Sequence, residues 1–150
     1  MELKKSQVLN FLGKHNLMAV ATFGNFPWIA SVYYTFDNDL NLYFLSAPST
    51  LHCQQIVKNE KVAVAIAESR QDINKPKRGL QISGVAQRIS GLAKIKYALD
   101  LWKKGLGVID PEITYKAVTG SMYKVTPQRI KLFDQELFKV PDGKEPVLEL

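Results

Sequence analysis

The sequence predicts a mainly β fold, a small β-barrel with helices packed outside it. About six or seven short segments alternate apolar and polar residues or form short apolar runs bounded by turn residues, and fewer segments have helical periodicity. The first three predicted strands are joined by turns too short for crossover helices, so an antiparallel sheet is favoured over an α/β fold. The 150 residues, 46% hydrophobic, suit one packed domain over 1–150, ending in a tail from about residue 137 to 150.

The first helix is expected over residues 2–13, where apolar residues recur at helical spacing and Gly13 is placed to end it. Residues 17–23 form an apolar run followed by Gly24 and Asn25, which indicates a strand and a turn.

The second strand is expected over 27–36. Its alternation places two sets of side chains on opposite faces, Trp28, Ala30, Val32, Tyr34 and Phe36 on one and Ile29, Ser31, Tyr33 and Thr35 on the other. After a turn at 37–39, a third strand over about 40–46 runs into a helix over about 50–59.

The second half of the chain continues this pattern. Small residues follow one face of a strand over 62–67, and a loop over 69–79 precedes a strand over 80–89 in which Gly84 suggests a bulge. Residues 91–104 form the clearest helix, with an apolar stripe for core or interface packing at Leu92, Ile95, Leu99 and Trp102. Two last strands are expected over 119–126 and 129–134, joined tightly at Pro127.

Charge and cysteine content narrow the class of protein. The net charge is +6, but the basic residues are scattered and no nucleic-acid-binding motif is present, so a nucleic-acid partner is not favoured. No apolar run approaches the roughly 20 residues of a membrane span, and the charged N-terminus lacks a secretory pattern. The single cysteine, Cys53, fits a reducing compartment. We expect a cytoplasmic protein with no membrane partner.

Candidate site residues gather where the third strand meets the next helix. Ser49, Thr50 and His52 lie in the expected first turn, where free backbone N–H groups beside hydroxyls and an imidazole can hold a phosphate. The alternative is that Ser49 and Thr50 only cap the helix. His15 and His52 lack partners at ligand spacing, so no metal site is expected, and no catalytic group can be identified.

An ordered set of segments carries a resemblance to a known family. The segments are Pro27 to Asp37, Tyr43 to Ser46, Thr50 to His52, Val62 to Ala65 and Gln81 to Ala86. In this order they resemble the FMN-binding split β-barrel of the pyridoxamine 5′-phosphate oxidase superfamily, in particular its small bacterial branch. The resemblance covers about residues 5–135.

The resemblance implies a homodimer with FMN bound in clefts between the subunits. By position, Ser31, Val32 and Tyr33 would run along the flavin, and Ser46, Thr50 and His52 would lie at its phosphate. Gln81 and Ser83 would reach the flavin of the partner subunit.

Two departures separate the chain from the oxidase itself. The phosphate loop has Leu51 and His52 where the oxidase carries Arg and Lys, and the oxidase's Arg-x-His substrate clamp has no counterpart. At an unperturbed pKa of ~6.5, His52 would be partly charged at neutral pH. The sequence therefore predicts an FMN-dependent oxidoreductase that is not a pyridoxamine 5′-phosphate oxidase, with a small-molecule substrate or a nicotinamide electron donor. A non-catalytic flavin or haem carrier and a basic nucleic-acid-binding barrel are the alternatives.

Overall fold

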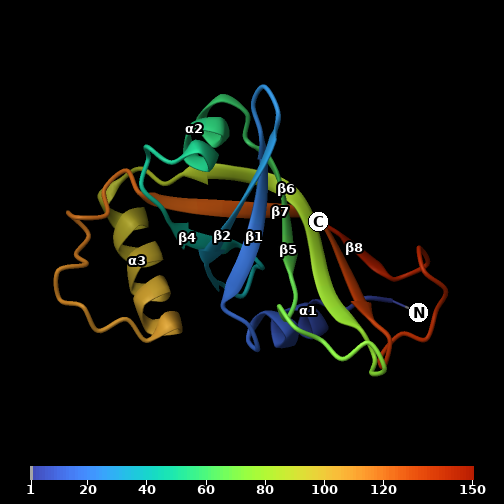
Figure 1. The fold of residues 1–150 in the computed structure, drawn as a ribbon. Coiled ribbons are helices and arrows are strands. Elements are labelled where there is room, and N and C mark those ends of the chain that lie inside the picture. Colours follow the sequence, from blue (N-terminus) through green and yellow to red (C-terminus); the bar gives the residue numbers. More distant parts are fainter. Residues whose placement is uncertain (1) are drawn as a thin grey trace.

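The computed structural model describes residues 2–150, and its strands form one curled, antiparallel sheet with three helices around it (Figure 1). The strands are β1 (Leu17–Phe23), β2 (Pro27–Tyr33), β3 (Thr35–Phe36), β4 (Leu42–Leu45), β5 (Lys61–Ile66), β6 (Arg78–Arg88), β7 (Met122–Asp134) and β8 (Val147–Glu149). The helices are α1 (Lys5–Leu12), α2 (Leu51–Lys58) and α3 (Leu92–Leu106). The sheet order is β2-β1-β5-β6-β7-β4-β3, with β8 pairing with β7. The predicted mainly β, split-barrel fold is confirmed.

The sheet curls around a hydrophobic core. Inward side chains of β1 and β5 alternate with outward ones, and Val20, Val64 and Ile66 are almost fully buried. Val8 and Leu12 of α1 join this core. A second cluster lies under α3, where Ile95, Leu99 and Trp102 pack beside Tyr43 and Met122. Most of the predicted α3 stripe is therefore core, but Leu92, in the first turn, is 57% exposed.

The expected strand over 27–36 breaks at Tyr34. This side chain is 1% exposed, and its hydroxyl donates to the carbonyl of Leu12, 2.9 Å away. The predicted alternation holds through Tyr33, but Thr35, expected to be on the outward face, is buried. Because Tyr34 anchors the chain to the end of α1, the alternation does not continue across the break.

The two strands expected around Pro127 are one strand, β7. Ser83 pairs with Arg129 and Gly84 pairs with Pro127, so β7 has one extra residue here and forms a bulge. A proline cannot donate to a regular ladder, but it fits a bulge. A Cβ on Gly84 would lie 2.3 Å from the carbonyl oxygen of Thr126, so only glycine lets the strands approach here. Gly84 was expected at a bulge, and the prediction of a turn at Pro127 was wrong.

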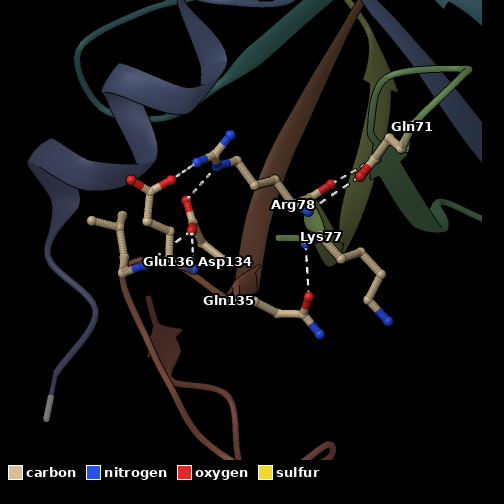
Figure 2. A network of polar contacts seen from close by, with 7 residues as sticks. Gln71, Lys77, Arg78, Asp134, Gln135 and Glu136 are labelled. Carbon is tan, nitrogen blue, oxygen red and sulfur yellow. Dashed lines mark hydrogen bonds and ion pairs between the residues drawn. The ribbon is translucent and has the colours of Figure 1, made fainter. Parts of the chain in front are cut away.

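A polar network ties the beginning of β6 to the end of β7 (Figure 2). The Arg78 guanidinium contacts Asp134, at 3.3 Å from Nε to Oδ2, and it also contacts Glu136. Asp134 accepts hydrogen bonds from the backbone N–H groups of Glu136 and Leu137 through Oδ1. The main chain of Arg78 is bonded in turn by the Gln71 amide. This network holds the loop before β6 and the residues after β7 against the sheet.

Across residues 2–150, none of the helices combines the length and the apolar character needed to cross a membrane.

Candidate functional site

Three predicted site residues meet where α2 begins, and we call them the helix-start cluster: Ser46, Thr50 and His52. His52 Nε2 lies 3.0 Å from Ser46 Oγ and 3.5 Å from Thr50 Oγ1. Thr50 Oγ1 donates to the carbonyl of Ala47 at 2.8 Å, which tightens the loop between β4 and α2. The cluster thus joins the end of a strand to the beginning of a helix.

The beginning of α2 has no side-chain cap. Thr50 occupies the N-cap position with extended backbone angles (φ −67°, ψ 151°), but its hydroxyl does not bond to the amides of the first turn. Ser49 is exposed, and its carbonyl accepts a hydrogen bond from the Gln54 amide. The capping alternative therefore does not account for these hydroxyls, and the first-turn N–H groups keep their capacity for an anion.

His52 is less basic than its sequence position suggested. The residue is 8% exposed, and burial lowers the pKa of its imidazole from the ordinary value of 6.5. The ring therefore carries less charge at neutral pH than an unperturbed histidine would. Next to two hydroxyls, its neutral form works as a hydrogen-bonding group.

The second group of predicted residues lies on the outer face of the sheet. The strand pairings give two rows of side chains across β2, β1, β5 and β6, which run Ile29–Ala21–Ala63–Ser83 and Ser31–Ala19–Ala65–Gln81. A third pair, Leu17 and Tyr33, extends the surface along the hairpin. We call these residues the outer face.

The outer face is apolar at one side and small in its middle. Ile29 is 62% exposed, Tyr33 57% and Leu17 47%, and the alanines between them leave a flat surface. Ser31, Gln81 and Ser83 supply the polar groups there. Val32, the remaining predicted residue, is 8% exposed because its side chain points into the core. Only its main chain can meet a ligand on this surface.

One polar residue that the sequence did not single out, Tyr123, lies on the strand that pairs with β4. Tyr123 of β7 pairs with Phe44 of β4 on one side and with Arg88 of β6 on the other. Among the described residues, the buried Tyr123 hydroxyl has no hydrogen-bond partner. The Cys53 thiol of α2 lies close to this hydroxyl. The position of Tyr123 cannot be read from the sequence because it depends on a pairing with Phe44 across about 80 positions.

A separate pocket of about 570 Å³ lies at the other end of the sheet, between α1 and the loop before β6. Its charged lining has equal numbers of basic and acidic side chains, namely Lys14, Arg70, Lys75, Arg78, Glu68, Asp72, Asp134 and Glu136. The Arg78 guanidinium forms ion pairs with Asp134 and Glu136. None of the predicted site residues lies in this pocket.

A curled antiparallel sheet with an uncapped helix after β4 defines a split-barrel protein. The family model described as pyridoxamine 5′-phosphate oxidase matches residues 5–133. The chain belongs to this family. No curated protein sequence matches the chain significantly.

Solved structures agree on the fold. General stress protein 26 from Bacillus anthracis superposes with a TM-score of 0.68 at 15% identity, with 97% of this chain and 98% of that one covered. A FAD-binding protein from Mesorhizobium loti gives 0.66 at 16% identity, with 85% and 90% covered. A haem-binding protein from Mycobacterium smegmatis gives 0.66 at 16% identity, with 99% and 59% covered. At these identities the likeness establishes the fold alone.

Proposed function

We propose that the protein binds FMN at the interface of a homodimer and acts as a flavin-dependent oxidoreductase. One observation carries the proposal: the predicted flavin-contact residues lie on one exposed sheet face, and the predicted phosphate residues meet at an uncapped helix start. Family membership and the FAD-binding neighbour agree with a flavin.

The outer face supports a second copy of this chain as the partner. Burying an exposed apolar sheet surface against a partner is favourable, by about 25 cal/mol per Å² of apolar area. Its middle is small and uncharged, with Ala19, Ala21, Ala63 and Ala65, so two such faces can approach closely. On β7 the two rows continue to Lys131 and Arg129, but these cations are in ion pairs with Glu145 and Glu149, so the nucleic-acid alternative is not favoured.

The chain's own residues would hold FMN in two places. Ser31, Tyr33 and the main chain of Val32 would line the ring, with Gln81 and Ser83 of the partner subunit opposite. Ser46, Ser49, Thr50, His52 and the first-turn N–H groups of α2 would take the phosphate. Bound FMN supplies the hydride or electron chemistry, and the protein orients the ring and excludes water from it.

The absorption spectrum of the purified protein tests the cofactor. We expect flavin bands, and FMN rather than FAD or riboflavin after the protein is unfolded and the released compound identified. A haem spectrum would support the alternative of a haem carrier, and one structurally similar protein is a haem-binding protein. A colourless protein that binds no added FMN would overturn the proposal. A flavin that no donor and acceptor pair can turn over would support a carrier.

Light scattering of the purified protein tests the dimer. We expect a dimer, and we expect Ala63→Glu to give a monomer because it places a charge in the middle of the outer face. Ile73→Glu is the matched control, since Ile73 is 96% exposed in the loop between β5 and β6 and is not part of the outer face. A monomeric wild type, or an Ala63→Glu variant that remains dimeric, would contradict the composite site.

A further inference from the structure

The helix-start cluster contains no permanent cation. Leu51 is apolar, Thr50 is neutral, and burial lowers the pKa of the His52 ring, which disfavours its charged form. Phosphate monoesters carry between one and two negative charges at neutral pH, and charge-assisted hydrogen bonds are about twice as strong as neutral ones. An FMN phosphate here would need a cation from another element.

Arg88, the last residue of β6, lies at the same end of the sheet. It pairs with Tyr123, and Tyr123 pairs with Phe44, so the three form one row across β6, β7 and β4. Neighbouring strands are about 4.8 Å apart, which separates the outer two by about 10 Å. Ser46 follows Phe44 by two positions and therefore shares its face, and its N–H bonds to the carbonyl of Ser121 at 2.9 Å.

The guanidinium of Arg88 lies over the beginning of β7. Its Nη1 is 4.0 Å from where a Cβ on Gly120 would stand, one residue before Ser121. Its charge also acts on the buried Tyr123 hydroxyl, opposing the burial that raises the pKa of this phenol. Within residues 2–150, Arg88 has no carboxylate within ion-pair distance, and the Tyr123 hydroxyl has no hydrogen-bond partner. A free cation and an orphaned buried donor thus lie beside Ser46.

We propose that Arg88 is the cation of this anion site and sets its preference for a phosphorylated flavin. The inference rests on the proposed function. Arg88 comes from a strand remote in sequence and takes the role that the residues at 51 and 52 cannot fill. Tyr123 lies on the strand between those of Arg88 and Phe44, with its hydroxyl buried near the Cys53 thiol, and this hydroxyl would donate to the same anion.

Flavin titrations of the apoprotein, followed by fluorescence quenching, test this. We compare FMN with riboflavin, which lacks the phosphate, for the wild type, Arg88→Gln, Arg88→Lys and Arg70→Gln. We expect the wild type to prefer FMN, and Arg88→Gln to weaken FMN binding about 10–100-fold, the scale of a lost charge-assisted hydrogen bond, with riboflavin unchanged. Arg88→Lys should recover part of the preference. Arg70→Gln removes the same charge from an exposed loop and should change neither affinity.

The outcomes separate the two proposals. A wild type that prefers FMN and an Arg88→Gln variant that keeps this preference would overturn the role of Arg88 and leave FMN binding intact. Equal losses for FMN and riboflavin in Arg88→Gln would also overturn it, since the residue would then act on the fold. A wild type that binds neither flavin would overturn the proposed function and this inference with it. An unchanged unfolding midpoint would show that each variant is folded.

Discussion

Strand β6 carries an arginine at each end, and the two have different surroundings. Arg78, at its beginning, contacts Asp134 and Glu136, and the nearby pocket has balanced charge (Figure 2). Arg88, at its end, has no ion-pair partner among the described residues, and its Nη1 lies 4.0 Å from where a Cβ on Gly120 would stand, just before β7. One arginine of β6 is therefore neutralised by ion pairs, and the other has no carboxylate partner among the described residues.

At the Arg78 end the charges of Arg78, Asp134 and Glu136 are paired with one another, so removing one of them should cost folding free energy. At the Arg88 end the buried Tyr123 hydroxyl lacks a partner among the described residues, and this is the end where we propose that an anion binds. Pocket volume alone would not identify the proposed binding site, because a sizeable pocket lies at the Arg78 end.

The largest effect is expected at the Arg78 end. Asp134→Ala removes the partner of Arg78 and the acceptor of two backbone N–H groups, and we expect unfolding free energy to fall by about 2–3 kcal/mol. FMN affinity should not change. Urea denaturation and an FMN titration measure the two quantities. Glu136→Gln is the control, because this exposed partner should contribute less than about 1 kcal/mol. A similar loss from both variants would show that the buried acceptor has no special role.

The next effect is expected at the helix-start cluster. Thr50→Ala removes a hydroxyl beside the first-turn N–H groups, and we expect FMN binding to weaken by about 1–3 kcal/mol. Unfolding free energy should change little, because Thr50 makes no cap hydrogen bond. Paired titrations with FMN and riboflavin measure this. Equal losses for the two flavins would mean that Thr50 only holds the loop through Ala47.

A smaller, pH-dependent effect is expected from His52. Its pKa in the folded protein lies below 6.5, and only the imidazolium adds charge to the site, so its contribution to FMN binding grows as the pH falls through that value. His52→Ala should therefore weaken FMN binding more at pH 6 than at pH 8, by roughly 1 kcal/mol or less. Comparing variant and wild type at each pH cancels the titration of the phosphate itself. A loss that is the same at both pH values would show that His52 acts only as a neutral group.

The same lowered pKa has a consequence for stability without ligand. The unfolded chain binds a proton at His52 more readily than the folded one, so stability decreases as the pH falls below the unfolded value of about 6.5. His15 has a pKa lowered by burial as well and contributes in the same direction. His52→Ala should therefore reduce, but not abolish, the loss of stability in acid.

The smallest effect on folding is expected from Tyr123→Phe. The Tyr123 hydroxyl has no partner among the described residues, so removing it should leave unfolding free energy unchanged or raise it by up to about 1 kcal/mol. FMN binding should weaken while riboflavin binding does not, because only the phosphate would use this hydroxyl. A clear loss of stability in the variant would show that the hydroxyl makes a hydrogen bond in the folded protein and is not free to bind a ligand.

Much of the fold was predictable because it depends on local patterns. The apolar run at 17–23 and the small residues of 62–67 gave the correct strands, and Gly84 was recognised as a bulge. The strand break at Tyr34 and the continuity of β7 through Pro127 were missed. Both depend on partners far away in sequence, the Leu12 carbonyl for Tyr34 and Gly84 for Pro127. Local propensity cannot contain this information.

By itself the sequence determined the strand alternation that puts Ser31 and Tyr33 outward, and the helix that brings Thr50 and His52 to the end of β4. These follow from periodicities of two and of 3.6 residues, which a short segment carries within itself. Only the tertiary structure decided that burial lowers the pKa of the His52 ring, that Thr50 leaves its helix uncapped, and that Arg88 pairs with Tyr123 across β6 and β7. Burial and strand pairing are properties of the assembled sheet, and so is the electrostatic character of the site.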